Sequence, residues 1–144
     1  MKLAEHYASL LRRPVAVVRK TRVTGATVHA EDIAGDVASR PSRPAVILDD
    51  MISTGATIEA AAGVVLAHGG VPGIVVAATH GPLVAAAASR LGRLPVRRVL
   101  TTDSLAQDQP PMPALQVESV APLLADAIGR LHHNQPLGDL LVRT

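Results

Sequence analysis

The sequence contains no cysteine, phenylalanine or tryptophan, and Tyr7 is its only tyrosine. Without cysteine, disulfide frameworks and thiolate metal sites are excluded. Aromatic platforms for stacking bases are also missing, and the net charge is only +2, so we do not expect nucleic-acid binding. No apolar run reaches the roughly 18 residues of a membrane span, and Glu5 and His6 interrupt any signal-peptide core. We therefore expect a cytoplasmic enzyme or binding protein.

The composition favours one α/β domain. Residues 1–144 are enough to bury roughly two-thirds of the unfolded surface in a single core. The apolar fraction is 48%, almost all of it Ala, Val, Leu and Ile. Small and β-branched residues suit a parallel sheet covered by helices. We find no internal repeat and predict a single domain.

The stretch from Pro44 to Gly70 combines a strand, an acidic pair, a loop and a helix. The apolar run Ala45 to Leu48 is short and β-branched, which predicts a buried strand. Asp49 and Asp50 follow at its carboxyl end, where open α/β sheets bind ligands. Five small residues come next, and then apolar residues recur at helical spacing: Ser53, Thr54, Gly55, Ala56 and Thr57, then Ile58, Ala61, Ala62, Val65 and Leu66.

This order of elements predicts a site for a phosphorylated sugar. Backbone N–H groups and the dipole at a helix start favour a phosphate group. Asp49 and Asp50 are placed to accept hydrogen bonds from sugar hydroxyls, directly or through a metal ion.

The nine residues Asp49 to Thr57, DDMISTGAT, resemble the ribose-phosphate binding motif of type I phosphoribosyltransferase folds. The order Met-Ile-Ser-Thr-Gly is most similar to the ribose-phosphate pyrophosphokinase family, the synthetases that make phosphoribosyl pyrophosphate. The resemblance implies a doubly wound parallel sheet of about five strands. It also implies a 5-phosphate site at Thr54, Gly55, Ala56 and Thr57, with Ser53 in the same substrate-binding loop. Ala56 is a departure, because the family more often has glycine there.

The same resemblance assigns Asp49 and Asp50 to the 2- and 3-hydroxyls of ribose 5-phosphate and to Mg²⁺. Ala-Thr-His-Gly, around His80, is also similar to the family. His80 is therefore expected near the site, although not as a catalytic residue.

Lys20 and Arg22 follow an expected strand, Val15 to Val18, and Lys2 is the only other lysine. If that strand is parallel to the others, the pair lies at the same sheet edge as the acidic pair. VVRKTR resembles the start of the family's flexible catalytic loop, which implies that Lys20 and Arg22 stabilise the transferring pyrophosphoryl group. A solvated surface pair is the alternative. The segment Val23 to Val28 fits either a β-flap or a loop.

Further strands and helices are expected along the rest of the chain. The expected strands are Gly73–Ala78, Val96–Leu100 and Leu115–Val117, and the expected helices are Leu83–Leu91 and Val120–His132. The likeness continues almost to Thr144, yet it covers only the second of the two similar domains of these synthetases. The other domain supplies most ATP-binding residues and a pyrophosphate-binding loop.

Three functions remain open. The chain could supply the ribose 5-phosphate site of a diphosphokinase that transfers pyrophosphoryl from Mg-ATP to give phosphoribosyl pyrophosphate. It would do so as a domain of a longer protein, in a homo-oligomer or with a partner chain. It could instead be a non-catalytic regulatory module that binds a ribose phosphate or nucleotide. A phosphoribosyltransferase using phosphoribosyl pyrophosphate is the third possibility, but the aromatic hood that usually recognises the base has no evident sequence here.

Overall fold

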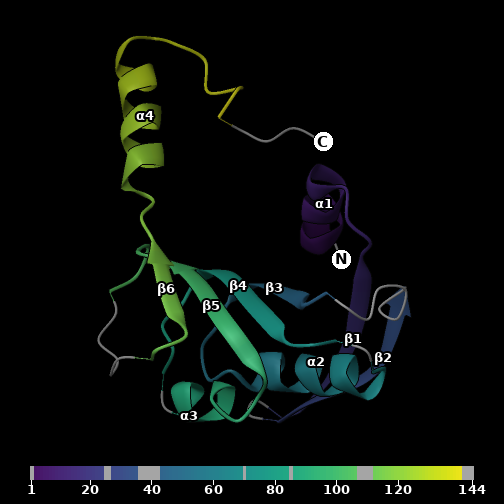
Figure 1. The fold of residues 1–144 in the computed structure, drawn as a ribbon. Helices are drawn as coiled ribbons and strands as arrows, with labels where there is room; N and C mark the ends of the chain where they lie inside the picture. Colours follow the sequence, from purple (N-terminus) through teal and green to yellow (C-terminus); the bar gives the residue numbers. More distant parts are fainter. Residues whose placement is uncertain are drawn as a thin grey trace.

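The computed structural model describes residues 2–24, 27–35, 43–69, 71–84, 86–106 and 112–140, which form helices on a parallel sheet and a separate hairpin (Figure 1). In chain order the elements are α1 (Lys2–Leu11), β1 (Ala16–Thr24), β2 (Thr27–Gly35), β3 (Ala45–Met51), α2 (Ala56–Ala67), β4 (Ile74–His80), α3 (Ala87–Leu91), β5 (Val96–Thr102), β6 (Leu115–Glu118) and α4 (Ala121–His132). Within these residues, no helix is long and apolar enough to cross a membrane.

Strands β3, β4, β5 and β6 form a parallel sheet in that order. Helices α2 and α3 cover one face, where the core lies, and α1 stands on the other side of the sheet (Figure 1). The core is built from aliphatic side chains of these elements: Ile52, Ile58, Ala62, Ile74, Val76, Ala78, Leu83, Ala87, Leu91 and Val99. The expected α/β class is confirmed, with four parallel strands among the described residues.

The first strand is not part of this sheet. β1 pairs with β2 in an antiparallel, two-stranded sheet whose register runs from Ala16 opposite Gly35 to Thr24 opposite Thr27. A short connection suffices for antiparallel neighbours, whereas a parallel pair requires a crossover of a dozen or more residues. Lys20 and Arg22 were expected at the same sheet edge as the acidic pair if their strand is parallel to the others. Because β1 is antiparallel to β2 and lies outside the parallel sheet, this condition is not met. Of the two readings of Val23 to Val28, the β-flap agrees with the described residues.

The third helix is shorter than expected, because it spans Ala87–Leu91 and not Leu83–Leu91. Leu83 has φ of 46°, outside the helical region, and its side chain is buried in the core. Its N–H donates to the Ile52 carbonyl oxygen at 3.0 Å. Leu83 therefore joins two loops at the sheet edge and does not start the helix.

Helix α4 follows β6 and rises away from the sheet on the same side as α1 (Figure 1). Its large apolar side chains are more than half exposed, with Ile128 at 67% and Leu131 at 62%. The expected helical pattern is present, but in the described part of the chain this helix contributes no buried residue.

Candidate functional site

The acidic pair lies at the carboxyl end of β3, as expected for a ligand-binding edge. Asp49 is opposite Ala78 in the register, and Met51 is opposite His80. A four-residue loop, Ile52 to Gly55, then leads into α2. The order strand, carboxylates, loop and helix start agrees with the sequence expectation.

The loop after β3 is fixed to the loop after β4. The N–H of Ile52 donates to the His80 carbonyl oxygen at 2.9 Å, and the N–H of Leu83 donates to the Ile52 carbonyl oxygen at 3.0 Å. The Ile52 side chain is 1% exposed and packs in the core. This anchor leaves Ser53 half-buried and Thr54 exposed, so the outer part of the loop faces solvent from a fixed base.

Gly55 is the N-cap residue of α2 and has φ of 76°, a left-handed conformation that glycine adopts without strain. The first internal bond of α2 runs from the Glu59 N–H to the Gly55 carbonyl oxygen at 2.9 Å. The N–H groups of Ala56, Thr57 and Ile58 therefore precede the helical hydrogen-bond ladder. Thr54 Oγ1 lies 3.5 Å from the Ala56 nitrogen, a weak contact. This helix start is suited to bind an anion.

One acidic side chain lies in the first turn of α2, and its charge is paired. Glu59 Oε2 lies 3.3 Å from Arg90 Nε, which is on α3. Both side chains are partly exposed, so the pair adds little stability. Its more useful effect is to offset a negative charge that would otherwise repel an anion at the helix start.

The exit of β4 approaches β5 closely at Gly81. A Cβ atom on Gly81 would lie 2.4 Å from Thr101 Cγ2, so only glycine fits without a shift of backbone or side chain. Thr101 is 2% exposed. The close approach of Gly81 to Thr101 keeps the carboxyl ends of β4 and β5 next to each other.

Hydroxyl groups at the ends of β4 and β5 hold His80. Thr102 Oγ1 donates to the Thr79 carbonyl oxygen at 2.7 Å. Ser104 Oγ lies 2.9 Å from Thr102 Oγ1 and 2.8 Å from His80 Nδ1. The ring of His80 is therefore tied to the neighbouring strand. The sequence analysis expected His80 near this edge. Its partner Ser104 is distant in the chain. The only sequence signal for this contact is the run of polar residues at the end of the next strand.

A cavity of about 250 Å³ opens beside these strand ends, between α1 and the sheet. Apolar side chains make up much of its wall, and Asp49, Thr79, Thr102 and Glu118 add polar groups. The remaining lining residues are Leu3, Tyr7, Leu48, Ala77, Ala78, Leu100 and Thr101.

Asp49 and Asp50 are suited to bind a metal ion only when a bound substrate supplies further oxygen atoms. The described residues contain no group of three or more His, Cys, Asp or Glu side chains that could hold a metal ion. Mg²⁺ commonly binds one or two protein carboxylates and completes its shell with waters and substrate oxygens. Asp49 and Asp50 therefore fit Mg²⁺ shared with a phosphorylated sugar, but not an ion held by protein ligands alone.

The predicted cationic pair lies on β1, away from the strand-end loops in sequence and in a different sheet. In the hairpin, Lys20 pairs with Ala30 and Arg22 with Val28. The side chains of Lys20 and Arg22 lie outside the part of the structure that is described. Their catalytic role therefore stays a prediction.

The comparisons with known proteins agree with this arrangement. Residues 28–142 match a family model described as "Phosphoribosyl synthetase-associated domain". The chain belongs to this family.

Similar proteins include ribose-phosphate pyrophosphokinases of two bacteria. The protein of Caldanaerobacter subterraneus subsp. tengcongensis is 35% identical over 138 residues, covering 95% of this chain and 42% of the relative. The protein of Corynebacterium efficiens is 41% identical over 137 residues, covering 93% of this chain and 41% of the relative. The chain therefore spans about two-fifths of the length of these curated relatives.

A solved structure supports the fold. The phosphoribosylpyrophosphate synthetase from Mycobacterium smegmatis superposes with a TM-score of 0.76 at 34% sequence identity, covering 92% of this chain and 42% of that one. The resemblance read from Asp49 to Thr57 is thus confirmed at the level of the family, and the phosphoribosyltransferase-type fold is confirmed with it.

Proposed function

We propose that this chain supplies the ribose 5-phosphate site of a ribose-phosphate pyrophosphokinase. In that reaction the 1-hydroxyl of ribose 5-phosphate attacks the β-phosphorus of ATP. The bond between the β-phosphorus and the α,β-bridging oxygen breaks, which gives phosphoribosyl pyrophosphate and AMP. The observation that carries the proposal is the fixed loop between β3 and α2, which places two carboxylates beside a helix start suited to a phosphate.

The 5-phosphate binds at the start of α2. N–H groups of Gly55, Ala56 and Thr57 and the hydroxyls of Ser53, Thr54 and Thr57 supply donors to its oxygens. The phosphate receives these bonds where the helix dipole adds a favourable field. Burial of Ile52 positions the loop before the ligand arrives, which limits the ordering cost of binding.

The sugar hydroxyls bind the acidic pair. Asp49 and Asp50 accept hydrogen bonds from the 2- and 3-hydroxyls, which leaves the 1-hydroxyl free to react. Asp49 and Asp50 would also hold Mg²⁺, which would neutralise negative charge on the substrates. His80 and its Ser104 contact border the same edge and restrict the orientation of the sugar.

Lys20 and Arg22 are the proposed catalytic residues, because cations stabilise the charge that builds up on a transferring pyrophosphoryl group. Support comes from the position of their hairpin, since β2 lies against α2, the helix that starts at the phosphate loop (Figure 1).

We infer that the chain, residues 1–144, is one phosphoribosyltransferase-type domain equivalent to the second half of a two-domain synthetase. These residues match about two-fifths of the length of the relatives, so the proposal places the ATP site outside them, on the same polypeptide, on another copy or on a partner chain. The second candidate is a module that binds ribose 5-phosphate without catalysis, which the helix start of α2 equally allows.

One experiment tests both candidates. AMP formation is measured with ribose 5-phosphate, ATP and Mg²⁺, and the heat of ribose 5-phosphate binding is recorded on the same preparation. We expect binding that Asp50→Ala weakens at least about tenfold, while Asp126→Ala, an exposed carboxylate on α4, leaves it unchanged. Binding without turnover selects the non-catalytic module. Absence of binding contradicts both candidates.

A further inference from the structure

The cavity between α1 and the sheet is bordered by a row of polar residues that crosses all four parallel strands. Thr102 is opposite Glu118 in the register of β5 and β6. The registers of the neighbouring strands place Thr79 and Asp50 in the same row, on β4 and β3. Thr102 Oγ1 also donates to the Thr79 carbonyl oxygen at 2.7 Å. The row therefore has a carboxylate at each end and two hydroxyl groups between them.

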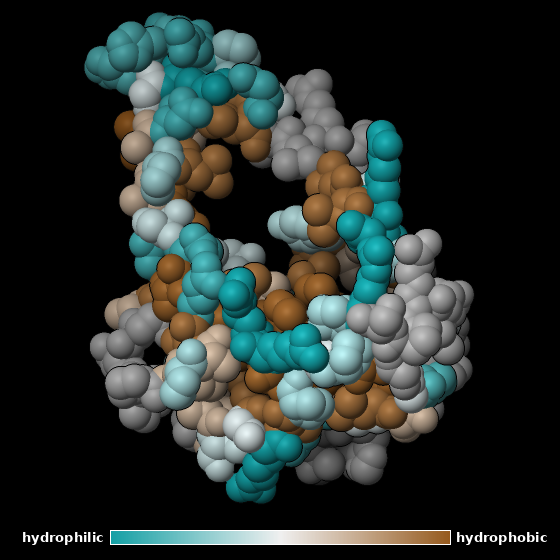
Figure 2. All heavy atoms as spheres, in the orientation of Figure 1, coloured by the Kyte–Doolittle hydropathy of each residue, from teal (hydrophilic) through white to brown (hydrophobic). Residues whose placement is uncertain are grey.

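An apolar row lies beside this polar row. Leu48, Ala77 and Leu100 each precede a residue of the polar row by two positions, so they point to the same face of the sheet. Leu3 and Tyr7 of α1 line the cavity from the other side. Figure 2 shows hydrophobic atoms on α1 toward the hollow and again over the sheet beneath it. The cavity is therefore a slot with apolar walls and one polar border.

The acidic groups lie at opposite ends of this slot. Asp49 and Glu118, both lining residues, are on the first and the last of the four strands. Adjacent strands are about 4.8 Å apart, so three spacings separate these ends by roughly 14 Å. Glu118 is exposed and accepts a hydrogen bond from Gln116 Nε2 at 2.5 Å. Because a carboxylate accepts several hydrogen bonds, Glu118 retains capacity for a ligand.

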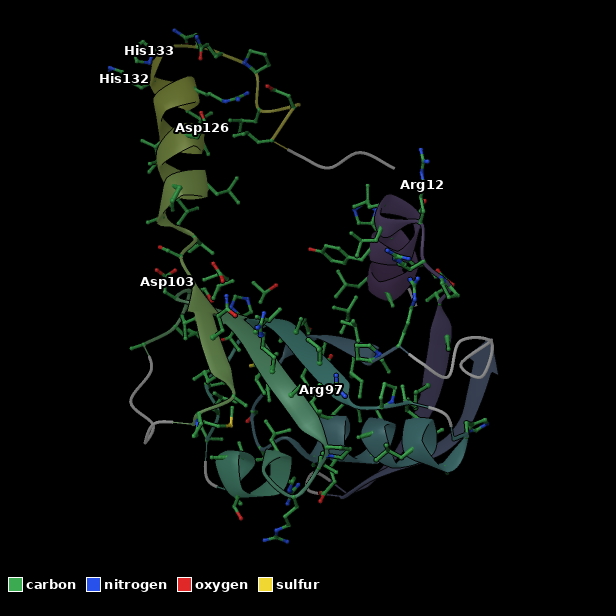
Figure 3. All side chains as sticks on the ribbon, in the orientation of Figure 1. Arg12, Arg97, Asp103, Asp126, His132 and His133 are labelled. Carbon is green, nitrogen blue, oxygen red and sulfur yellow. The ribbon has the colours of Figure 1, made fainter. Side chains whose placement is uncertain are left out.

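The charge around the slot favours a cation. The described residues that line it include two carboxylates and no basic side chain. Arg98 precedes Leu100 by two residues, toward the start of β5, and is not a lining residue. Arg12 lies at the end of α1 that points away from the sheet, and Arg97 lies near the start of β5 (Figure 3). Asp103 follows β5 and adds a further carboxylate beyond the polar row. Walls of low polarity strengthen this negative field.

We propose that the slot binds a linear aliphatic polyamine, with ammonium groups at both ends and methylene chains between them. One terminal ammonium binds the carboxylates at the end of β3, and the other binds Glu118. The methylene chains lie on the apolar row, as the stem of a lysine lies on an apolar surface. An inner ammonium lies level with the hydroxyl groups of Thr79 and Thr102, which have acceptor capacity. The ring of Tyr7 adds a cation–π contact.

Other cations match the slot less well. A divalent metal ion requires several oxygen ligands close together. In the part of the chain that the structure describes, no group of three His, Cys, Asp or Glu side chains could hold such an ion. A monoamine leaves one of the two ends without a partner, and a short diamine does not span roughly 14 Å. The separation of the two ends therefore selects a longer molecule with charge at both of its ends.

The first test is calorimetric titration of the whole chain with spermidine at an ionic strength of about 0.15 M. Ribose 5-phosphate and Mg²⁺ are left out, because Asp49 also borders the proposed sugar site. We expect saturable binding of one spermidine per chain. Octamethylenediamine has its terminal ammonium groups equally far apart and should bind within about tenfold of spermidine. Putrescine and hexylamine should bind at least about tenfold more weakly. Equal affinities for putrescine and spermidine would mean unspecific attraction to acidic groups and would overturn the proposal.

Substitutions locate the binding site. Glu118→Gln should raise the spermidine dissociation constant at least about fivefold, because one end of the slot loses its charge. Glu5→Gln is the matched control: Glu5 is exposed on α1, is not a lining residue, and should change the constant less than about twofold. Ala77→Leu fills part of the slot and should weaken spermidine at least about tenfold. An unchanged far-ultraviolet circular dichroism spectrum shows that each variant is folded. Spermidine binding insensitive to both Glu118→Gln and Ala77→Leu overturns the proposal.

The same variants keep this proposal separate from the proposed function. Glu118 is not part of the proposed ribose 5-phosphate site, so Glu118→Gln should leave ribose 5-phosphate affinity within about twofold. A chain that binds ribose 5-phosphate but not spermidine contradicts only the polyamine site. A chain that binds spermidine but not ribose 5-phosphate contradicts only the proposed function.

Discussion

Asp103 and Ser119, on either side of β6, are joined by a hydrogen bond of 2.5 Å from the Ser119 hydroxyl to the Asp103 carboxylate. The Val120 N–H donates to the same carboxylate at 2.8 Å, and Ser119 Oγ accepts from the Ala121 N–H at 3.2 Å. One carboxylate thus links the end of β5 to the start of α4. Because these bonds favour the ionised form, they lower the pKa of Asp103.

The first prediction concerns the pH dependence of this link. A folded-state pKa below the unfolded value stabilises the fold above about pH 4 and loses that contribution as the pH falls through the folded pKa. Asp103→Ala should therefore lower the melting temperature by a few degrees at pH 7 and by less below about pH 4. Thermal unfolding of both proteins at each pH measures the difference. An equal effect at both pH values would falsify the ionic basis of the link.

Gly55→Ala is the second prediction, and it concerns the stability of the turn that precedes α2. The φ of 76° at Gly55 should cost an alanine about 1–2 kcal/mol, although there is space for the methyl group 3.6 Å from Leu91 Cγ. Gly63→Ala is the matched control, because Gly63 lies inside α2 with nothing within 4 Å of an added Cβ. That control should stabilise the fold by about 0.5–1 kcal/mol. Urea unfolding reports both values, and equal signs would contradict the strained-turn account.

The third prediction follows from the close approach of Gly81 to Thr101. An added methyl group would lie 2.4 Å from Thr101 Cγ2 and 2.9 Å from its Cβ. Gly81→Ala should therefore destabilise the fold by about 1–3 kcal/mol through overpacking. Thr101→Ser removes Cγ2, so the double variant should recover part of the loss, with a coupling of at least about 0.5 kcal/mol. Strict additivity in urea unfolding would show that the two residues do not oppose each other.

The local spacing of apolar and acidic residues was sufficient to predict the strand, loop and helix from β3 to α2. The spacing of five apolar residues predicted one face of α2 that packs on the core: Ile58, Ala61, Ala62, Val65 and Leu66. The first four are buried, and Leu66 is partly buried against the core. The acidic pair was predicted at a strand end and lies there. These features depend on neighbours within one or two turns or on strand alternation, which a sequence shows directly.

Pairing between distant segments was not predictable in the same way. The apolar pattern of β1 is compatible with a parallel or an antiparallel neighbour, and its partner is set by the short connection to β2. The helix expected at Val120–His132 is present as α4, yet the exposure of its apolar side chains goes with the contact of its start to Asp103, a residue that follows another strand. The contact of His80 with Ser104 likewise joins two strand ends far apart in the chain.

The fourth prediction separates catalysis from binding at the proposed site. Lys20→Ala should slow pyrophosphoryl transfer at least about 100-fold while leaving ribose 5-phosphate affinity within about twofold, because the cation acts on charge present only in the transition state. Arg13→Ala, an exposed cation before β1, is the control and should leave both quantities unchanged. Initial rates of AMP formation and calorimetric titration with ribose 5-phosphate give the two numbers. Loss of ribose 5-phosphate binding in Lys20→Ala would instead make Lys20 part of the sugar-phosphate site, since a residue that acts only in the transition state contributes nothing to the affinity for this substrate.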